Sequence, residues 1–224
     1  MQGTNCLAAR NLGKVNRQVS TARLVLATRN SGKIVEFRRI LAELHPSSID
    51  LLGLEHFPEL QDVEETGDTF LENALLKART VCRETGLPAI ADDSGLCIDA
   101  LDGAPGVLSA RWSGVHGNDG ANIEKVLAQL VQIPEGERGA YFNSVAAFVM
   151  PDGRESTSEA IMSGTILRQP IGTFGFGYDP IFLPEGSALS LAELDAQTKD
   201  KISHRGQSLR SIAPRVAAML GVLG

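Results

Sequence analysis

Ala89-Ile-Ala-Asp-Asp-Ser-Gly95 is a short apolar run that stops on two adjacent carboxylates. Its first three residues have the pattern of the end of a buried strand, and we expect Asp92, Asp93 and Ser94 to lie where that strand leaves the sheet. Gly95 would then permit a sharp turn. Ligands of open α/β sheets bind at this edge, and paired carboxylates there favour a hard divalent cation. A strand end followed by an Asp-rich turn is the simpler alternative.

The composition of the 224 residues is that of an ordinary globular protein, long enough for one large domain or two small ones. The net charge of −6 argues against binding along DNA or RNA, which requires a basic face. It leaves room for a single nucleotide held by a local basic cluster and a metal ion. Cys6, Cys82 and Cys97 are too scattered for a disulfide framework, which fits a reducing cytoplasm. No apolar run is long enough to cross a membrane.

Residues 1–22 contain several basic residues but lack the apolar segment of a secretory signal. We expect them to form a flexible N-terminal extension or to reflect an over-predicted start codon. An organelle-targeting peptide is a weaker alternative. The folded part of the chain is expected to begin at about Arg23.

A strand, a polar loop and a helix follow one another after this point. Arg23-Leu-Val-Leu-Ala-Thr28 has the pattern of a short, largely apolar strand, and apolar residues then recur at helical spacing from position 34. The loop Thr28-Arg-Asn-Ser-Gly-Lys33 would aim its amides and the helix N-terminus at one spot, which favours an anion. Lys33 supports this prediction, because a cation in the first turn opposes the helix dipole unless an anion is present. The alternative is a simple helix start capped by Asn30 or Ser31.

An acidic segment at 59–68, which includes the pair Glu64-Glu65, leads into a second helix. Thr69-Phe-Leu-Glu72 has the pattern of a capping box at its start. Asn73 and Lys77 lie one turn apart and would be able to face the same ligand. Such an acidic run is more often only a solvated loop.

The second half of the chain contains a predicted hairpin. Residues 138–150 form a long strand, Pro151-Asp-Gly153 a turn, and residues 155–167 the returning strand with an irregularity at Gly164. We expect this pair to form a β-rich lobe of its own. Asp119 is expected to cap a helix just before it.

Gly172-Thr-Phe-Gly-Phe-Gly-Tyr-Asp-Pro180 is a second unusual loop. Its glycines allow close backbone approach, and Phe174, Phe176 and Tyr178 supply flat apolar faces. We expect Phe176 to stack on a planar base. The alternative is a tight glycine turn with its aromatic side chains in the core.

A basic cluster follows a short helix predicted at residues 191–196. Thr198-Lys-Asp-Lys-Ile-Ser-His-Arg-Gly206 gathers Lys199, Lys201, His204 and Arg205 within an acidic protein. A solvated basic turn is the usual form of such a run. Taken with the carboxylates and the two loops, however, it completes the parts needed for a nucleoside triphosphate and its cation, and oxygen-only ligands suit Mg²⁺.

Six motifs resemble, in order, those of the inosine triphosphate pyrophosphatase family over about residues 23–222. The motifs are Thr28-Arg-Asn-Ser-Gly-Lys33, Glu65-Thr-Gly67 with Glu72-Asn-Ala74 and Lys77, Ala91-Asp-Asp-Ser-Gly95, Ser109-Ala-Arg111, Phe176-Gly-Tyr-Asp-Pro180 and Ser203-His-Arg-Gly206. The resemblance implies an elongated α/β fold with a mixed sheet and two lobes, the active-site cleft between the lobes, and a homodimer. It also implies one catalytic domain over residues 23–224.

The resemblance also implies site roles. Asp93 would be the general base and a Mg²⁺ ligand, with Glu65 as the other metal carboxylate. The triphosphate would be held by Thr28, Arg29, Asn30, Ser31, Gly32, Lys33, Lys77 and Ser94. The base and sugar would be held by Phe176, Gly177, Tyr178, Asp179, Lys199, His204 and Arg205.

The implied reaction converts ITP, XTP and their deoxy forms to the monophosphate and pyrophosphate, through water attacking the α-phosphorus. ATP would be rejected because only a 6-keto group accepts a hydrogen bond from His204 or Arg205. One alternative is a pyrophosphatase for other modified nucleotides. Another is a nucleotide-binding regulator without catalysis, which the presence of both Glu65 and Asp93 disfavours.

Overall fold

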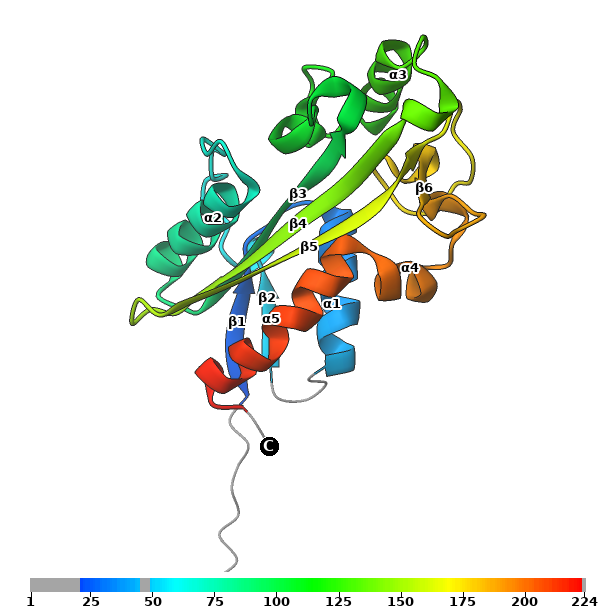
Figure 1. Cartoon of the computed structure of the whole chain (residues 1–224). Helices are drawn as coiled ribbons and strands as arrows, with labels where there is room; N and C mark the ends of the chain where they lie inside the picture. Colours follow the sequence, from blue (N-terminus) through cyan, green and yellow to red (C-terminus); the bar gives the residue numbers. More distant parts are fainter. Residues whose placement is uncertain (1–20, 45–48, 223–224) are drawn as a thin grey trace, which may run out of the picture.

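The protein is described by a computed structural model that covers residues 21–44 and 49–222. A mixed sheet in the order β2-β1-β3-β4-β5-β6 runs through it (Figure 1). Its strands within the described residues are β1 (Ala22–Leu26), β2 (Ile49–Gly53), β3 (Ala89–Ile98), β4 (Gly139–Val149), β5 (Glu155–Ile166) and β6 (Phe182–Pro184). The helices there are α1 (Ser31–Leu44), α2 (Phe70–Thr85), α3 (Asp119–Gln129), α4 (Ala196–Ile202) and α5 (His204–Leu220).

The sheet combines two kinds of pairing. β1 pairs in parallel with β2 and β3, and the neighbours from β3 to β6 are antiparallel. This confirms the predicted α/β class with a mixed sheet. The extension expected over residues 1–22 lies outside the described residues except for Thr21 and Ala22, and Ala22 already belongs to β1.

Helices cover both faces of the sheet (Figure 1). α2 packs on one face in a core that contains Val25, Ala91 and Val145. α1 and α5 pack on the other face in a core that contains Leu24 and Ile90. Successive strand residues point to opposite faces, so β1 and the first residues of β3 contribute apolar side chains to both cores. None of the helices within the described residues is long and apolar enough to cross a membrane.

The expectation that β3 ends at the two aspartates is wrong. β3 continues to Ile98, and it pairs with β4 without a break from Ala89 to Ile98. Gly95 is not in a turn: a Cβ there would lie 2.3 Å from the carbonyl oxygen of Gly106, so its role is to let this backbone approach the strand. The strand can carry two aspartates in its middle because helices on each face supply cations to them, as described below.

The predicted hairpin is present, and it belongs to the same sheet as β1 and β3. β4 and β5 turn at residues 151–153 and extend the same sheet through the pairing of β3 with β4. Their register runs unbroken past Gly164, so the expected irregularity is absent. Glycine is needed there because β6 passes close by: a Cβ at Gly164 would lie 2.3 Å from the carbonyl oxygen of Leu183.

The C-terminal region is more helical than predicted. The helix expected at 191–196 is a single 3₁₀ turn, Leu191–Glu193, and most of the basic cluster lies in α4 and the start of α5. Ser203 separates these helices, and its hydroxyl accepts a hydrogen bond from the Gly206 amide at 3.0 Å. The capping box at Thr69 is present, whereas α3 is capped by Asn118 rather than by Asp119.

Candidate active site

A cleft of about 950 Å³ brings together the side chains that the sequence singled out. Its lining comes from the loop after β1, the segment at 62–65, α2, the middle of β3, the segment at 107–119, the loop at 176–179, and α4 and α5. The predicted site residues that line it are Thr28, Arg29, Asn30, Ser31, Gly32, Lys33, Glu65, Lys77, Asp93, Ser94, Phe176, Gly177, Tyr178, Asp179, Lys199, His204 and Arg205. Their roles toward a nucleotide remain predictions.

The loop between β1 and α1 forms one wall. Asn30 caps α1, because its Oδ1 accepts the Lys33 amide at 3.0 Å. Lys33 Nζ lies 3.0 Å from Asp92 Oδ2, so a carboxylate of the protein itself balances the cation in the first turn. Burial lowers the pKa of Lys33, and the charge of Asp92 only partly offsets this. Arg29 pairs with a different segment, because its guanidinium lies 2.6 Å from Asp62 in the loop before α2.

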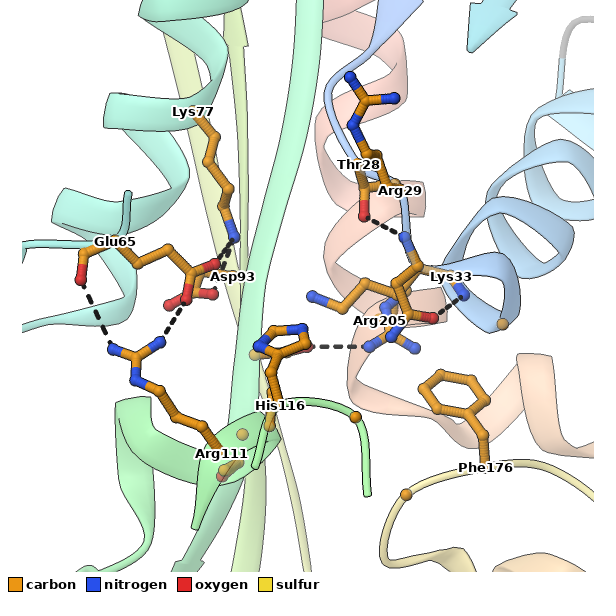
Figure 2. Close-up of a pocket in the computed structure, with 18 of the residues that line it drawn as sticks. Thr28, Arg29, Lys33, Glu65, Lys77, Asp93, Arg111, His116, Phe176 and Arg205 are labelled. Carbon is orange, nitrogen blue, oxygen red and sulfur yellow. Dashed lines mark hydrogen bonds and ion pairs between the residues drawn. The ribbon is translucent and has the colours of Figure 1, made fainter. Parts of the chain in front are cut away.

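On the other side of β3, α2 brings a lysine to two carboxylates (Figure 2). Lys77 Nζ donates to Glu65 Oε1 at 2.8 Å and to Asp93 Oδ1 at 2.9 Å. Arg111 donates to Glu65 Oε2 at 3.2 Å. Asn73 does not face the cleft as expected. Its side chain binds the backbone of Gly67 at 2.8 and 3.2 Å, which fixes the loop that carries Glu65.

The three charged groups of this cluster differ in protonation behaviour. Burial raises the pKa of Asp93, and the charge of Glu65 adds to this against the opposing effect of Lys77. Burial also disfavours the Glu65 carboxylate, but Lys77, Lys33 and Arg111 together outweigh it and lower the pKa of Glu65. Burial likewise disfavours the Lys77 ammonium, yet Asp93 and Glu65 outweigh that effect and raise the pKa of Lys77. Asp93 is therefore the more basic carboxylate of the two.

The donor set suits a hard divalent cation. Asp93 Oδ2 is buried and has no hydrogen-bond partner among the described residues. Glu65 and Asp93 offer only oxygen, as Mg²⁺ prefers, and substrate phosphates and water commonly complete such a site. Within residues 21–44 and 49–222, no group of three or more His, Cys, Asp or Glu side chains is placed to hold a metal. A divalent cation would therefore fit between the carboxylates of Glu65 and Asp93 and a substrate phosphate.

Phe176 lies over the first turn of α1. A Cβ at Gly32 would come within 2.6 Å of the Phe176 ring, so glycine is needed for this contact. The centroid of the same ring lies 4.9 Å from Lys199 Nζ and 5.4 Å from Arg205 Cζ, both cation–π contacts. The ring thereby joins the loop after β1 to the basic cluster.

Lys199 and Arg205 of the basic cluster are buried and paired rather than solvated, whereas Lys201 is exposed. Arg205 donates to Asp92 Oδ2 at 3.1 Å and to Ser94 Oγ at 2.8 Å, and it also pairs with Glu36. Lys199 lies 2.5 Å from Asp179 Oδ2 and 3.2 Å from Glu36 Oε1. Buried charges are tolerated when they are paired in this way.

His204 and Tyr178 are held in the walls. The His204 ring stacks on Phe142 with centroids 4.7 Å apart and planes at 4°. Burial, helped by Arg205 and Lys199, places the pKa of His204 well below 6.5, so the imidazole is neutral at neutral pH. Tyr178 is buried and its hydroxyl donates to the Ser109 carbonyl at 2.9 Å. Its ring therefore packs in the core, whereas Phe174 is 61% exposed.

Sequence reasoning missed Glu36, His116 and Asp119. His116 and Asp119 line the cleft, and Asp119 Oδ2 accepts the Gly177 amide at 2.7 Å. Glu36 neutralises Arg205 and Lys199 from helix α1. No local pattern marks Glu36, because its partners lie more than 160 residues away in the chain; a carboxylate beside the apolar face of α1 was the only signal. Arg111 belongs to one of the six motifs, and the structure shows that Glu65 is its carboxylate partner.

The sequence of this chain is similar to those of known proteins. The sequence profile of the Ham1 family matches residues 24–215. The chain belongs to the Ham1 family. A relative from Streptomyces avermitilis, named dITP/XTP pyrophosphatase, is 55% identical over 199 residues, which cover 89% of this chain and 99% of the relative. The Streptomyces coelicolor relative of the same name is 53% identical over 199 residues. The family predicted from the motifs is thus confirmed.

Solved Ham1-family structures agree with the fold. The crystal structure of the nucleoside-triphosphatase / dITP/XTP pyrophosphatase from Mycobacterium abscessus is 48% identical, with a TM-score of 0.70 over 86% of this chain and 99% of that one. A HAM1 protein from Coxiella burnetii is 41% identical, with a TM-score of 0.79 over 88% of this chain and 100% of that one. Both likenesses support the mixed α/β architecture.

Proposed function

We propose that this protein hydrolyses ITP, dITP, XTP and dXTP to the corresponding monophosphate and pyrophosphate, and so removes non-canonical purine nucleotides from the pool. The observation that carries the proposal is the position of Asp93. Its carboxyl group is buried in the cleft beside Glu65 and Lys77, has a raised pKa, and keeps Oδ2 without a hydrogen-bond partner in the described part of the chain. The names of relatives 46–55% identical to this chain support the same substrate class.

In the proposed reaction Asp93 acts as general base toward a water molecule. The water oxygen bonds to the α-phosphorus, its proton passes to Asp93, and the bond from the α-phosphorus to the α–β bridging oxygen breaks, releasing pyrophosphate. A raised pKa makes Asp93 a better base than an ordinary aspartate. A magnesium ion held by Glu65 and Asp93 would supply charge neutralisation for the phosphate oxygens.

The remaining residues would bind and orient the nucleotide. The loop Thr28–Lys33, Lys77 and Ser94 would hold the triphosphate, since they present amides, hydroxyls and cations to the cleft. Phe176, Gly177, Tyr178, Asp179, Lys199, His204 and Arg205 would form the base and sugar side. A 6-keto group there would accept a hydrogen bond from His204 or Arg205, whereas a 6-amino group would leave that donor unpaired.

Three further features belong to this proposal. Residues 23–224 would form one catalytic domain with two lobes, and the active protein would be a homodimer in the cytoplasm. Free, buried Cys82 and Cys97 fit a reducing compartment. The ligand of the protein would be a small purine nucleotide rather than a nucleic acid, in line with the net charge of −6. Analytical ultracentrifugation would test the dimer.

Product analysis with dITP, XTP, ATP, GTP and dTTP, with Mg²⁺ or with EDTA, tests the function. We expect magnesium-dependent release of pyrophosphate from dITP and XTP, with ATP almost untouched. Release of orthophosphate would move the attack away from the α-phosphorus. Equal turnover of all bases would keep the chemistry and contradict the specificity. Absence of any turnover would favour a binding protein without catalysis.

A further inference from the structure

Four carboxylate oxygens meet two cationic side chains in the cleft (Figure 2). Lys77 Nζ holds Glu65 Oε1 at 2.8 Å and Asp93 Oδ1 at 2.9 Å. Arg111 holds Glu65 Oε2 at 3.2 Å. Asp93 Oδ2 is the oxygen of the four that has no hydrogen-bond partner within the described residues. A cation shared by both carboxylates therefore needs at least one oxygen that a cationic side chain of the protein already holds.

We propose that Lys77 competes with the metal ion: its ammonium bridges Glu65 and Asp93 until the phosphates of a nucleotide draw it away, so that metal and triphosphate enter the site together. This inference rests on the proposed function for the identity of the metal carboxylates. It adds an order of binding and assigns Lys77 a second role, as a positioning residue that keeps the two carboxylates at one place.

Charge explains why the metal alone would bind weakly. Glu65 and Asp93 carry two negative charges, and Lys77 and Arg111 carry two positive ones, so the cluster is formally neutral. A divalent cation gains little from a neutral cluster and is repelled by the ammonium. A triphosphate brings several negative charges, which offer Lys77 new partners and leave both carboxylates free for the metal.

Contacts single out Lys77 rather than Arg111 as the group that moves. Lys77 contacts both carboxylates, whereas Arg111 contacts Glu65 alone, and a metal bridging the pair must replace the group that bridges it. A lysine side chain has a compact charge on a flexible four-carbon stem, so it can change partner without a backbone shift.

Titration with Mn²⁺, which binds oxygen ligands and is followed by electron paramagnetic resonance, tests this without turnover. We expect Lys77→Met to bind Mn²⁺ in the absence of nucleotide on the order of tenfold more tightly than the wild type, because a neighbouring positive charge is removed. Arg79→Met is the matched control: it removes one positive charge from the same helix, but Arg79 pairs with Glu155 outside the cleft and should leave Mn²⁺ affinity unchanged.

Two results overturn the inference. One is a folded Lys77→Met variant that binds Mn²⁺ no more tightly than Arg79→Met. The other is tighter binding by Arg111→Met but not by Lys77→Met, which would make Arg111 the competitor. Circular dichroism establishes whether each variant is folded.

A second measurement uses the wild-type protein in case Lys77→Met does not fold. Mn²⁺ affinity is compared with and without a dITP analogue whose α–β bridging oxygen is replaced by NH. We expect at least a tenfold gain with the analogue, and equal affinities would overturn the inference. Lack of dITP and XTP hydrolysis by the wild type, with the Mn²⁺ results as expected, would reject the proposed function and leave the competition between Lys77 and metal in place.

Discussion

Asp92 and Asp93 are adjacent in the chain, and their side chains contact helices on opposite faces of the sheet. Asp92 Oδ2 lies 3.0 Å from Lys33 Nζ of α1 and accepts from Arg205 of α5 at 3.1 Å. Asp93 Oδ1 accepts from Lys77 of α2 at 2.9 Å. Burial raises the pKa of both carboxyl groups, but for Asp92 the two cations outweigh it and hold the pKa far below the usual range. The pKa of Asp93 stays raised. One carboxylate is thus a fixed anion and its neighbour a candidate base.

Replacing this candidate base is the first prediction. Asp93→Asn should lower kcat for pyrophosphate release from dITP by roughly a hundredfold or more, because an amide cannot accept the proton. Binding of dITP, measured by calorimetry, should persist. Asp152→Asn, in the exposed β4–β5 turn, is the control and should leave kcat unchanged. Near-normal turnover by Asp93→Asn would reject Asp93 as the base.

The acid limb of the pH profile is the second prediction. The base must be deprotonated to act, and burial raises the pKa of Asp93 above that of an exposed aspartate. The value of kcat/KM should therefore fall, as pH decreases, at a pH above the ordinary aspartate pKa of about 3.9. Initial rates across a pH series, with folding checked at each pH, would measure this. A fall of kcat/KM only at or below that pH would contradict the assignment of Asp93 as the base.

Close packing at Gly32 gives the third prediction. A Cβ there would lie 2.6 Å from the Phe176 ring, so Gly32→Ala must displace the ring from the loop after β1. We expect KM for dITP to rise by roughly tenfold with a smaller change in kcat, since the altered contact positions substrate rather than reacting atoms. Gly120→Ala is the control, because its Cβ would meet only Asn118 Oδ1 at 3.9 Å. An unchanged KM for Gly32→Ala would mean that the position of the Phe176 ring does not affect nucleotide binding.

His204 gives a prediction about stability. Burial, with Arg205 and Lys199, lowers the pKa of His204 in the folded state, so below about pH 6.5 the unfolded chain binds one more proton than the folded chain. Stability therefore does not depend on the protonation of His204 well above that pH. It falls as the pH decreases from about 6.5 toward the pKa of His204 in the folded state. Between pH 7.5 and 5.5 the loss approaches about 1.4 kcal/mol.

His204→Asn should remove that part of the pH dependence, which urea unfolding at pH 7.5 and 5.5 would measure. His56→Asn is the matched control, since His56 lies on the surface, with 52% of its side chain exposed. An identical pH dependence in His204→Asn and the wild type would mean that His204 is not held neutral in the folded protein.

Much of the fold followed from short-range patterns. The strand, loop and helix at residues 23–44, the capping box at Thr69 and the β4–β5 hairpin were predicted because period, capping residues and turn residues are local properties. The end of β3 was predicted wrongly by the same logic. Acidic residues usually terminate a buried strand, and nothing near residue 92 reveals that Lys33, Lys77 and Arg205 will neutralise them.

The sequence by itself determined the identity of the family and the predicted site residues that the cleft brings together, but not His116 and Asp119. Each motif is a short run whose backbone form and chemical type are local. Only the tertiary structure decided which cation faces which carboxylate. The sequence left a solvated basic turn open as the alternative for Lys199 and Arg205, and only the structure shows that Glu36 and Asp179 pair with them. Burial and pairing arise between segments far apart in the chain, and these set the charge state of Asp93, Lys77 and His204.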